Sequence, residues 1–193
     1  KIIKYVIIDI LRNKIMLAYT VLLFLISITI FNLEDNSAKG LLSLLNIILI
    51  IVPLVSLLFS AIYVYNSSEF LELLVSQPLK RKTIWLSIFT GLASSMAFAF
   101  SIGAGIPILL YEATATGFMM LATGLLLSVI FVAIAMLAAV MARDKAKGIG
   151  VVILLWLYFS IIFDGLVLFI LFQFADYPLE KMMVGVVAFN PID

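Results

Sequence analysis

The fold is decided by residues 40–68, which read GLLSLLNIILIIVPLVSLLFSAIYVYNSS and contain no Asp, Glu, Lys or Arg. About 20 consecutive apolar residues are enough for a helix to cross the hydrocarbon core of a membrane. Four further stretches are equally free of these charges, namely residues 15–33, 83–111, 113–142 and 148–163. A helix of a soluble protein keeps one face polar. The pattern therefore predicts an all-α membrane protein with several spans.

The whole chain is predicted to be one transmembrane domain. Hydrophobic residues make up 65% of the 193 residues and charged residues 12%, and the mean hydropathy is +1.29. This leaves too few polar side chains to cover a separate water-exposed domain, so any soluble ATPase, receptor or enzyme must be another chain. We expect five spans, at residues 15–31, 41–65, 84–110, 117–142 and 149–174.

The loops between the predicted spans alternate in the sign of their charge. Basic residues dominate the segment before the first span and the second–third and fourth–fifth connections, namely Lys1, Lys4, Arg12, Lys14, Lys80, Arg81, Lys82, Arg143, Lys145 and Lys147. The other connections are mostly acidic and contain Glu34, Asp35, Lys39, Glu112, Asp176, Glu180 and Lys181. Since loops rich in Lys and Arg stay in the cytoplasm, we expect a cytoplasmic N-terminus and an external residue 193. The membrane surface would be anchored by Lys80, Arg81, Lys82, Arg143, Lys145 and Lys147.

The segment at residues 1–14 is amphipathic rather than uniformly apolar. At helical spacing its polar residues share one broad face, and these are Lys1, Lys4, Asp9 and Arg12. The pattern predicts a helix that lies in the cytoplasmic interface before the first span. A simple charged flank of that span is the alternative.

The connection at residues 66–83 is predicted to hold a short cytoplasmic helix along the membrane surface. Its polar and apolar positions separate onto two faces, with Glu69, Glu72 and Ser76 on one and Phe70, Leu73 and Leu74 on the other. Gln77-Pro78 would end the helix. Two interpretations stay open, because the acidic face could be simply solvated or could contact a cytoplasmic protein.

Asp164 is the one ionisable residue inside a predicted span. A charge at bilayer depth costs about 2.5–3.5 kcal/mol on insertion scales, so such residues usually face a partner or a cavity. Asp164 is therefore a candidate intramembrane polar site, either in a translocation path or as a structural hydrogen bond to a neighbouring helix.

The chain offers little material for catalysis or metal binding. It contains no Cys and no His, which removes thiol chemistry, disulfides and the usual zinc sites. No phosphate-cradling glycine motif is present, and we interpret the pair Met119-Met120 as apolar packing rather than a copper site. We predict no catalytic residue, no metal site, no cofactor within this chain and no nucleic-acid partner.

Several local features resemble the type-2 ABC transporter permeases over essentially the whole chain. They are the turn PLKRKTI at residues 78–84, the basic loop at 143–147 before a span with Trp156, the pair Phe163-Asp164, and the closing Asn190-Pro191-Ile192-Asp193. Within that family the chain is most similar to NosY-type permeases, which serve the maturation of nitrous oxide reductase. Such permeases have six spans, so we expect a further span after residue 193.

The resemblance implies a function and a set of partners. It implies a homodimer of two permease copies in the bacterial inner membrane, driven by a separate cytoplasmic ATPase that binds ATP and Mg. The cytoplasmic helix would then be a coupling helix that contacts the ATPase through Glu69, Phe70, Glu72, Leu73 and Gln77. The outer segment at residues 175–193 would meet a periplasmic repeat protein of copper-site assembly, with contacts from Asn190, Pro191 and Asp193. The implied activity is ATP-driven export or conformational work.

Three alternatives to a NosY-type role remain open at this point. The chain could serve another type-2 ABC exporter, for drugs, lipids, ions or gliding motility. It could be an ion-coupled secondary transporter that uses Asp164. It could also be a membrane anchor or assembly subunit without a translocation path.

Overall fold

The computed structural model describes residues 2–34, 36–76, 80–142, 144–173, 185, 187 and 189–192, with the side chains of residues 2–5 and 37 excepted. Within these ranges the chain is helical and contains no strand. The elements are α1 (Ile2–Leu11), α2 (Lys14–Leu33), α3 (Ser37–Asn66), α4 (Ser68–Val75), α5 (Arg81–Phe100), the π-helical turn η1 (Ser101–Gly105), α6 (Ile106–Tyr111), α7 (Ala115–Met141), α8 (Lys145–Leu157), the π-helical turn η2 (Tyr158–Ile162) and α9 (Phe163–Gln173).

Five helical stretches are long and apolar enough to cross a membrane, namely Lys14–Leu33, Ala38–Asn66, Arg81–Tyr111, Ala115–Met141 and Lys145–Gln173. The prediction of an all-α, multi-pass membrane protein is therefore confirmed. All five spans begin earlier than expected, and three of them begin at a basic residue, namely Lys14, Arg81 and Lys145, because long basic side chains can continue a helix while their charges reach water. Polar caps fix two of these three starts: Asn13 Oδ1 accepts the Ile15 backbone N–H at 2.9 Å, and the Asp144 carboxylate accepts the Lys147 backbone N–H at 3.0 Å.

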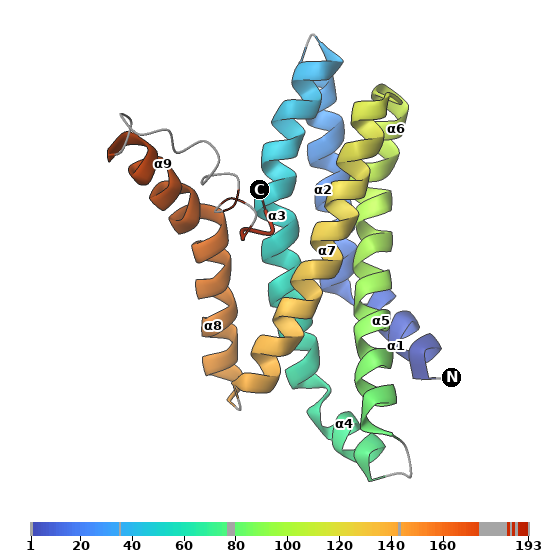
Figure 1. Ribbon diagram of the computed structural model, residues 1–193. Helices are drawn as coiled ribbons and strands as arrows, with labels where there is room; N and C mark the ends of the chain where they lie inside the picture. The colour runs from blue at the N-terminus through green and yellow to red at the C-terminus, as the bar shows by residue number, and fades with distance from the viewer. Residues whose placement is uncertain are drawn as a thin grey trace.

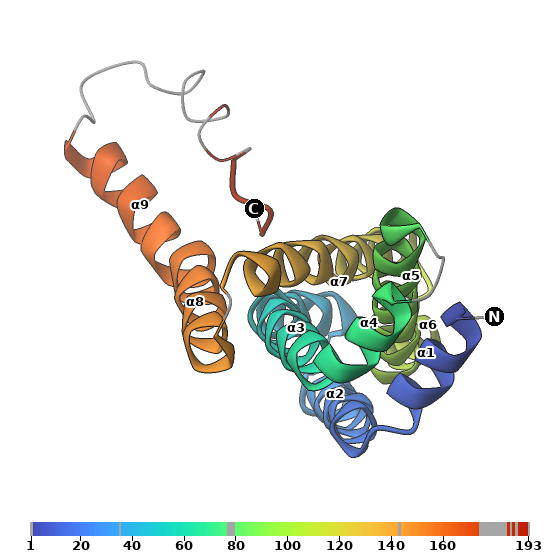
Figure 2. The ribbon, with the colours of Figure 1, turned by 90° about the horizontal axis from the view of Figure 1, so that it is seen from below.

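Four of the spans pack into one bundle, formed by α2, α3, the continuous α5–η1–α6 rod and α7 (Figure 1). α3 and α7 begin at the same end and lie side by side, and α5 packs against α7 (Figures 1 and 2). The interior is filled by apolar side chains without solvent exposure, such as Leu23, Leu92 and Phe131.

Small residues let the helices of this bundle approach closely. A Cβ atom at Gly124 of α7 would overlap the ring of Phe100 in α5, and a Cβ atom at Gly91 of α5 would overlap Val6 of α1. Gly103 of η1 lies against α2, where an added Cβ would come within 3.0 Å of a backbone carbonyl oxygen. In lipid, where apolar burial provides little driving force between helices, such close packing is what holds spans together.

The two prolines of the spans do not break their rods. α3 continues from Ser37 to Asn66 through the buried Pro53, and Pro107 stands in the first turn of α6, directly after η1. A π turn shifts the helical hydrogen bonds by one residue, and such turns are one of the usual causes of kinks inside long helices.

The two ends of the molecule differ in charge. α1, α4, the start of α5 and the α7–α8 turn lie at one end, the lower one in Figure 1. We call this the basic end, because it carries Arg12, Lys14, Lys80, Arg81, Lys82, Lys145 and Lys147. Glu34 and Glu112 lie at the opposite end, where α2 and α6 finish.

The second half of the fifth span stands apart from the bundle. α8 packs beside α3 and α7, and after η2 the chain continues as α9, which points away from the other helices (Figure 2). In the most apolar 18-residue stretch of the fifth span only 11% is buried, against 50–61% in the second, third and fourth spans. The fifth span therefore presents most of its surface outward.

Candidate functional site

The short helix α4 protrudes from the bundle at the basic end, between α3 and α5 (Figure 2). Glu69 and Glu72 are both exposed. Leu73 is 66% exposed although it is a large apolar residue, and Phe70 is also exposed. The outward surface of α4 therefore combines two carboxylates with two large apolar side chains, which we call the α4 face.

The apolar stripe of α4 differs from the one expected from the sequence. Leu74 is buried and Leu71 packs against the core, whereas Leu73 is exposed and Phe70 is partly exposed on the flank of the helix that faces α1. Leu71 and Leu74 are three residues apart and so share one side of a helix, while Leu73 follows Glu69 by four and shares the acidic side. Leu73 therefore lies beside Glu69 on the exposed side of α4, where a partner can contact it.

A single residue joins α4 to α3. The Ser67 backbone N–H donates to the Tyr63 carbonyl at 2.9 Å, and the Ser67 carbonyl accepts the Leu71 N–H at 2.9 Å. Ser67 therefore ends the hydrogen-bond ladder of α3 and begins that of α4. The two helices meet at this one residue.

The same end of α3 is fastened to the α7–α8 turn. The Tyr65 hydroxyl lies 2.8 Å from the Ala142 carbonyl oxygen and 3.2 Å from that of Ala139, so its proton serves carbonyls at the end of α7. Lys145 Nζ donates to Asn66 Oδ1 at 2.8 Å. Gly148 of α8 leaves the space that the Tyr65 ring occupies, since an added Cβ would overlap the hydroxyl. We call this set the α3–α7–α8 junction.

A cavity of about 330 Å³ separates α4 from α1 and is lined by polar groups from three elements. Across it the Tyr63 hydroxyl donates to Asp9 Oδ2 at 3.3 Å. Asn66 and Ser67 complete its polar lining, with Phe70 at its α4 side. α1 therefore contacts the point where α3 passes into α4. Sequence reasoning missed this link and the junction, because neither Tyr63 nor Tyr65 differs in pattern from other residues at span ends.

The predicted membrane-anchoring residues lie at the basic end. Lys80, Arg81 and Lys82 are exposed at the start of α5, and Lys145 and Lys147 are exposed in the first turn of α8. Two further predicted site residues, Gln77 and Arg143, lie outside the described residues.

Asp164 lies in the first turn of α9, directly after η2, and is exposed on the span that leans away from the bundle. It is not brought near the α4 face, since α9 lies at the far side of the molecule from α4 (Figure 1). The predicted polar site and the predicted coupling residues are thus separate features.

Asn190 is an internal anchor in this structure, with an exposed fraction of 3%. Its carboxamide Nδ2 donates to the Phe159 carbonyl in η2 at 3.1 Å, and its Oδ1 accepts the Ile192 N–H at 3.2 Å. The expected outer-side contact through Asn190 does not fit this burial, because both of its amide groups are engaged within the chain. Pro191 is half-buried, and Asp193 lies outside the described residues, as does most of the segment at residues 175–193.

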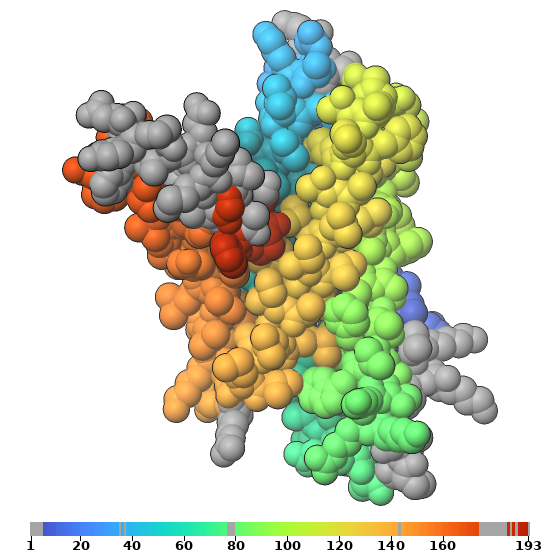
Figure 3. All heavy atoms as spheres, viewed as in Figure 1, coloured from blue at the N-terminus to red at the C-terminus, as the bar shows by residue number. Residues whose placement is uncertain are grey.

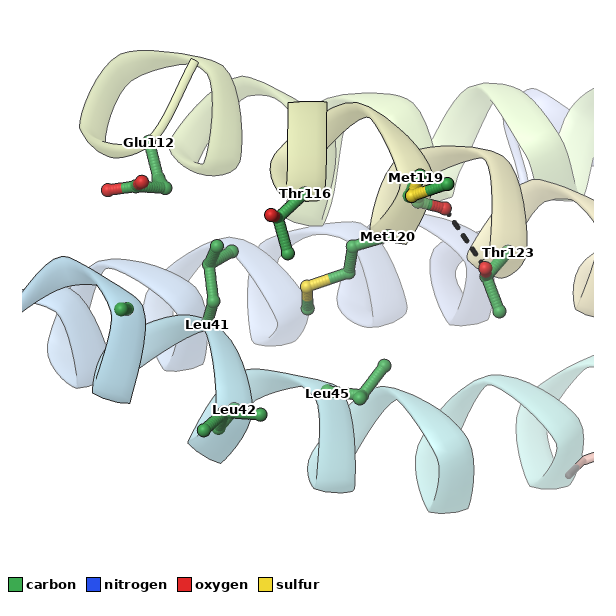
Figure 4. Close-up of a pocket in the computed structure, with 9 residues that line it drawn as sticks. Leu41, Leu42, Leu45, Glu112, Thr116, Met119, Met120 and Thr123 are labelled. Atoms are coloured by element: carbon green, nitrogen blue, oxygen red, sulfur yellow. Dashed lines mark hydrogen bonds between the residues drawn. The ribbon is translucent and has the colours of Figure 1, made fainter. Parts of the chain in front are cut away.

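A second cavity, of about 420 Å³, lies at the opposite end between α3 and α7. Figure 4 shows Met119 and Met120 of α7 facing Leu41, Leu42 and Leu45 of α3 across it, with Glu112 at its rim. The Thr123 hydroxyl donates to the Met119 carbonyl at 2.9 Å, which leaves little polar character in the lining. Sequence reasoning interpreted the two methionines as packing and missed the cavity.

The described residues hold no group of three or more His, Cys, Asp or Glu that could bind a metal ion. Comparison with protein-family models and with curated proteins finds no match for the chain. The function is therefore argued from the α4 face and from the helices to which it is joined.

Proposed function

We propose that this chain is the membrane-spanning permease subunit of an ABC transporter, in which α4 is the coupling helix for a separate cytoplasmic ATPase. The observation that carries the proposal is the α4 face. Glu69 and Glu72 alone would suit contact with water, but Phe70 and Leu73 would not. Interfaces between proteins place apolar anchors within a polar rim, and this is the pattern that α4 presents.

The connections of α4 support its role as a transmitter of force. It is joined to α3 by the single residue Ser67, which ends the ladder of α3 and begins that of α4, and the end of α3 is tied to the α7–α8 turn through Tyr65 and Asn66. A partner that displaces α4 would move α3 directly and α7 and α8 through the junction. ATP and Mg would be bound by the ATPase, and this chain would perform no chemistry.

In this proposal the basic end faces the cytoplasm, in a bacterial inner membrane. The distribution of Lys and Arg supports this orientation. A second permease copy would complete the transporter, and the outward surface of the fifth span is available for it. Copper-site maturation with a periplasmic repeat protein is the finer form of the proposal, supported by the likeness of Phe163-Asp164 and the closing residues to NosY-type permeases.

The test is a charge reversal on α4 with a matched control. In E69K/E72K we expect the chain to be produced and folded in detergent but to lose a co-purifying, Mg-dependent ATPase activity. The double variant E34K/E112K changes the net charge equally at the opposite end and should keep that activity. Equal activity in the two double variants would refute the assignment of α4 as the coupling helix.

The ion-coupled alternative makes a different prediction at Asp164. Substrate flux driven by an ion gradient without ATP, and abolished by D164N, would favour secondary transport. In the ABC proposal, D164N leaves the ATPase attached to the chain, because Asp164 lies far from the α4 face (Figure 1).

A further inference from the structure

A groove of about 760 Å³ runs between α5 and α7 and starts at the basic end. α5 and α7 lie side by side on the face seen in Figure 3. The groove is lined by Arg81 and Lys82 at the start of α5, and farther along by Trp85, Phe89 and Met136. It therefore changes from strongly cationic to apolar along its length.

The α5 wall follows from the spacing of its residues. Arg81, Trp85 and Phe89 are four residues apart in turn, so they form one stripe along the helix. The stripe is about 12 Å long at 1.5 Å per residue. The opposite wall comes from Ala133 and Met136 of α7, which are one turn apart. A linear apolar chain fits such a stripe better than a compact solute does.

The cationic end has the features of a phosphate site. Arg81 and Lys82 are both exposed and stand in the first turn of a long helix. Among the described residues no side chain caps this start, so the positive end of the helix dipole can face an anion. Two cations and a helix start together favour an anionic headgroup over a neutral one, and in a phospholipid bilayer the anion at this depth is a lipid phosphate.

We propose that this groove binds one anionic glycerophospholipid, with its phosphate at Arg81 and Lys82 and an acyl chain along Trp85, Phe89 and Met136. The occupant is a lipid because the groove belongs to a membrane span and joins a basic mouth at the level of the headgroups to an apolar wall at the level of the acyl chains. Half-buried Trp85 stands at the border between the two, where Trp is typical of membrane interfaces. The inference is independent of the proposed ATPase partner.

The full chain is purified in detergent and titrated with phosphatidylglycerol, and bound lipid is counted by native mass spectrometry. Phosphatidylcholine and inorganic phosphate are the comparison probes. We expect one phosphatidylglycerol to bind, and R81Q/K82Q to weaken it about tenfold, because each basic residue near a headgroup adds appreciable affinity. R81K/K82R should retain it, and both variants are checked for intact helicity.

Two further variants distinguish lipid binding in the groove from general electrostatic attraction of the lipid to the basic end. K14Q/K147Q removes the same charge at the same end and should leave the affinity for phosphatidylglycerol within about twofold of the original value, because neither residue lines the groove. A133F fills the groove, keeps both cations and should weaken binding about as much as R81Q/K82Q does, since the acyl chain loses its place.

Four results would overturn the proposal. Equal losses in R81Q/K82Q and K14Q/K147Q would show diffuse electrostatic attraction. Unchanged binding in A133F, or full competition by inorganic phosphate, would show a headgroup contact without a groove. If phosphatidylcholine bound as strongly as phosphatidylglycerol, Arg81 and Lys82 would not select the anionic lipid. In E69K/E72K lipid binding should persist, so that failure of the coupling proposal leaves this one standing.

Discussion

The helix bundle and the fifth span have similar compositions but use their glycines differently. In the bundle, Gly91 and Gly124 leave space that neighbouring side chains fill. At the start of the fifth span Gly148 likewise leaves space for Tyr65, but farther along Gly150 and Gly165 have no described atom within 4 Å of an added Cβ atom. Hydrophobicity brings every span into the membrane, but close packing decides which spans hold together within one copy. The fifth span therefore retains small residues that a neighbouring molecule can use.

The largest effect is expected from adding one methyl group inside the bundle. In G124A the new Cβ overlaps the Phe100 ring, and neither residue has free space into which to move. We expect a loss of about 1–3 kcal/mol of stability, seen as a lower midpoint of thermal unfolding in detergent.

G165A adds the same methyl group to the fifth span, where it meets open space, and should leave the midpoint nearly unchanged. Equal destabilisation by G124A and G165A would contradict the difference between the two regions. A small effect of both would show that the bundle is packed less tightly than the structure indicates.

A smaller effect is expected at the junction that connects the two regions. Y65F removes the hydroxyl that serves the carbonyls of Ala139 and Ala142, and we expect a cost of about 1 kcal/mol. The matched control is Y158F in η2, where the tyrosine is exposed. Thermal unfolding compares the two variants, and a larger loss in Y158F would argue against the Tyr65 hydroxyl as a stabilising tie between α3 and the end of α7.

The last prediction concerns association rather than stability. The chain contains no Cys, so a single cysteine at Gly165 can report on contacts between copies. We expect G165C to form a disulfide-linked dimer in membranes on mild oxidation. L126C, on the exposed side of α7, should stay monomeric. A cross-linked dimer of L126C but not of G165C would show that two copies meet through the bundle instead.

The spans could be predicted from the sequence because a charge-free stretch of sufficient length depends on composition alone. The existence of α4 also followed from local spacing. Its orientation did not, because the choice of Leu71 and Leu74 as inward residues depends on how α4 meets the rest of the bundle. The groove at Arg81 was invisible for the same reason, since half of its wall comes from α7.

The burial of Asn190 could not be anticipated from its neighbours in the sequence. Its partner is the carbonyl of Phe159, which is far away along the chain and lies inside a π-helical turn. The cavity at Met119 and Met120 likewise needs α3 as its second wall. Local patterns thus predicted elements, while the sites between elements required the structure.

The central claim is that the α4 face contacts a cytoplasmic ATPase, and a photo-reactive side chain placed at Leu73 tests it most directly. After irradiation of intact membranes we predict a covalent product between this chain and an ATP-binding subunit. The same probe at Phe118, which is exposed at the opposite end, should give no such product. No ATP-binding subunit in the Leu73 product, or equal yields from Leu73 and Phe118, would contradict the account.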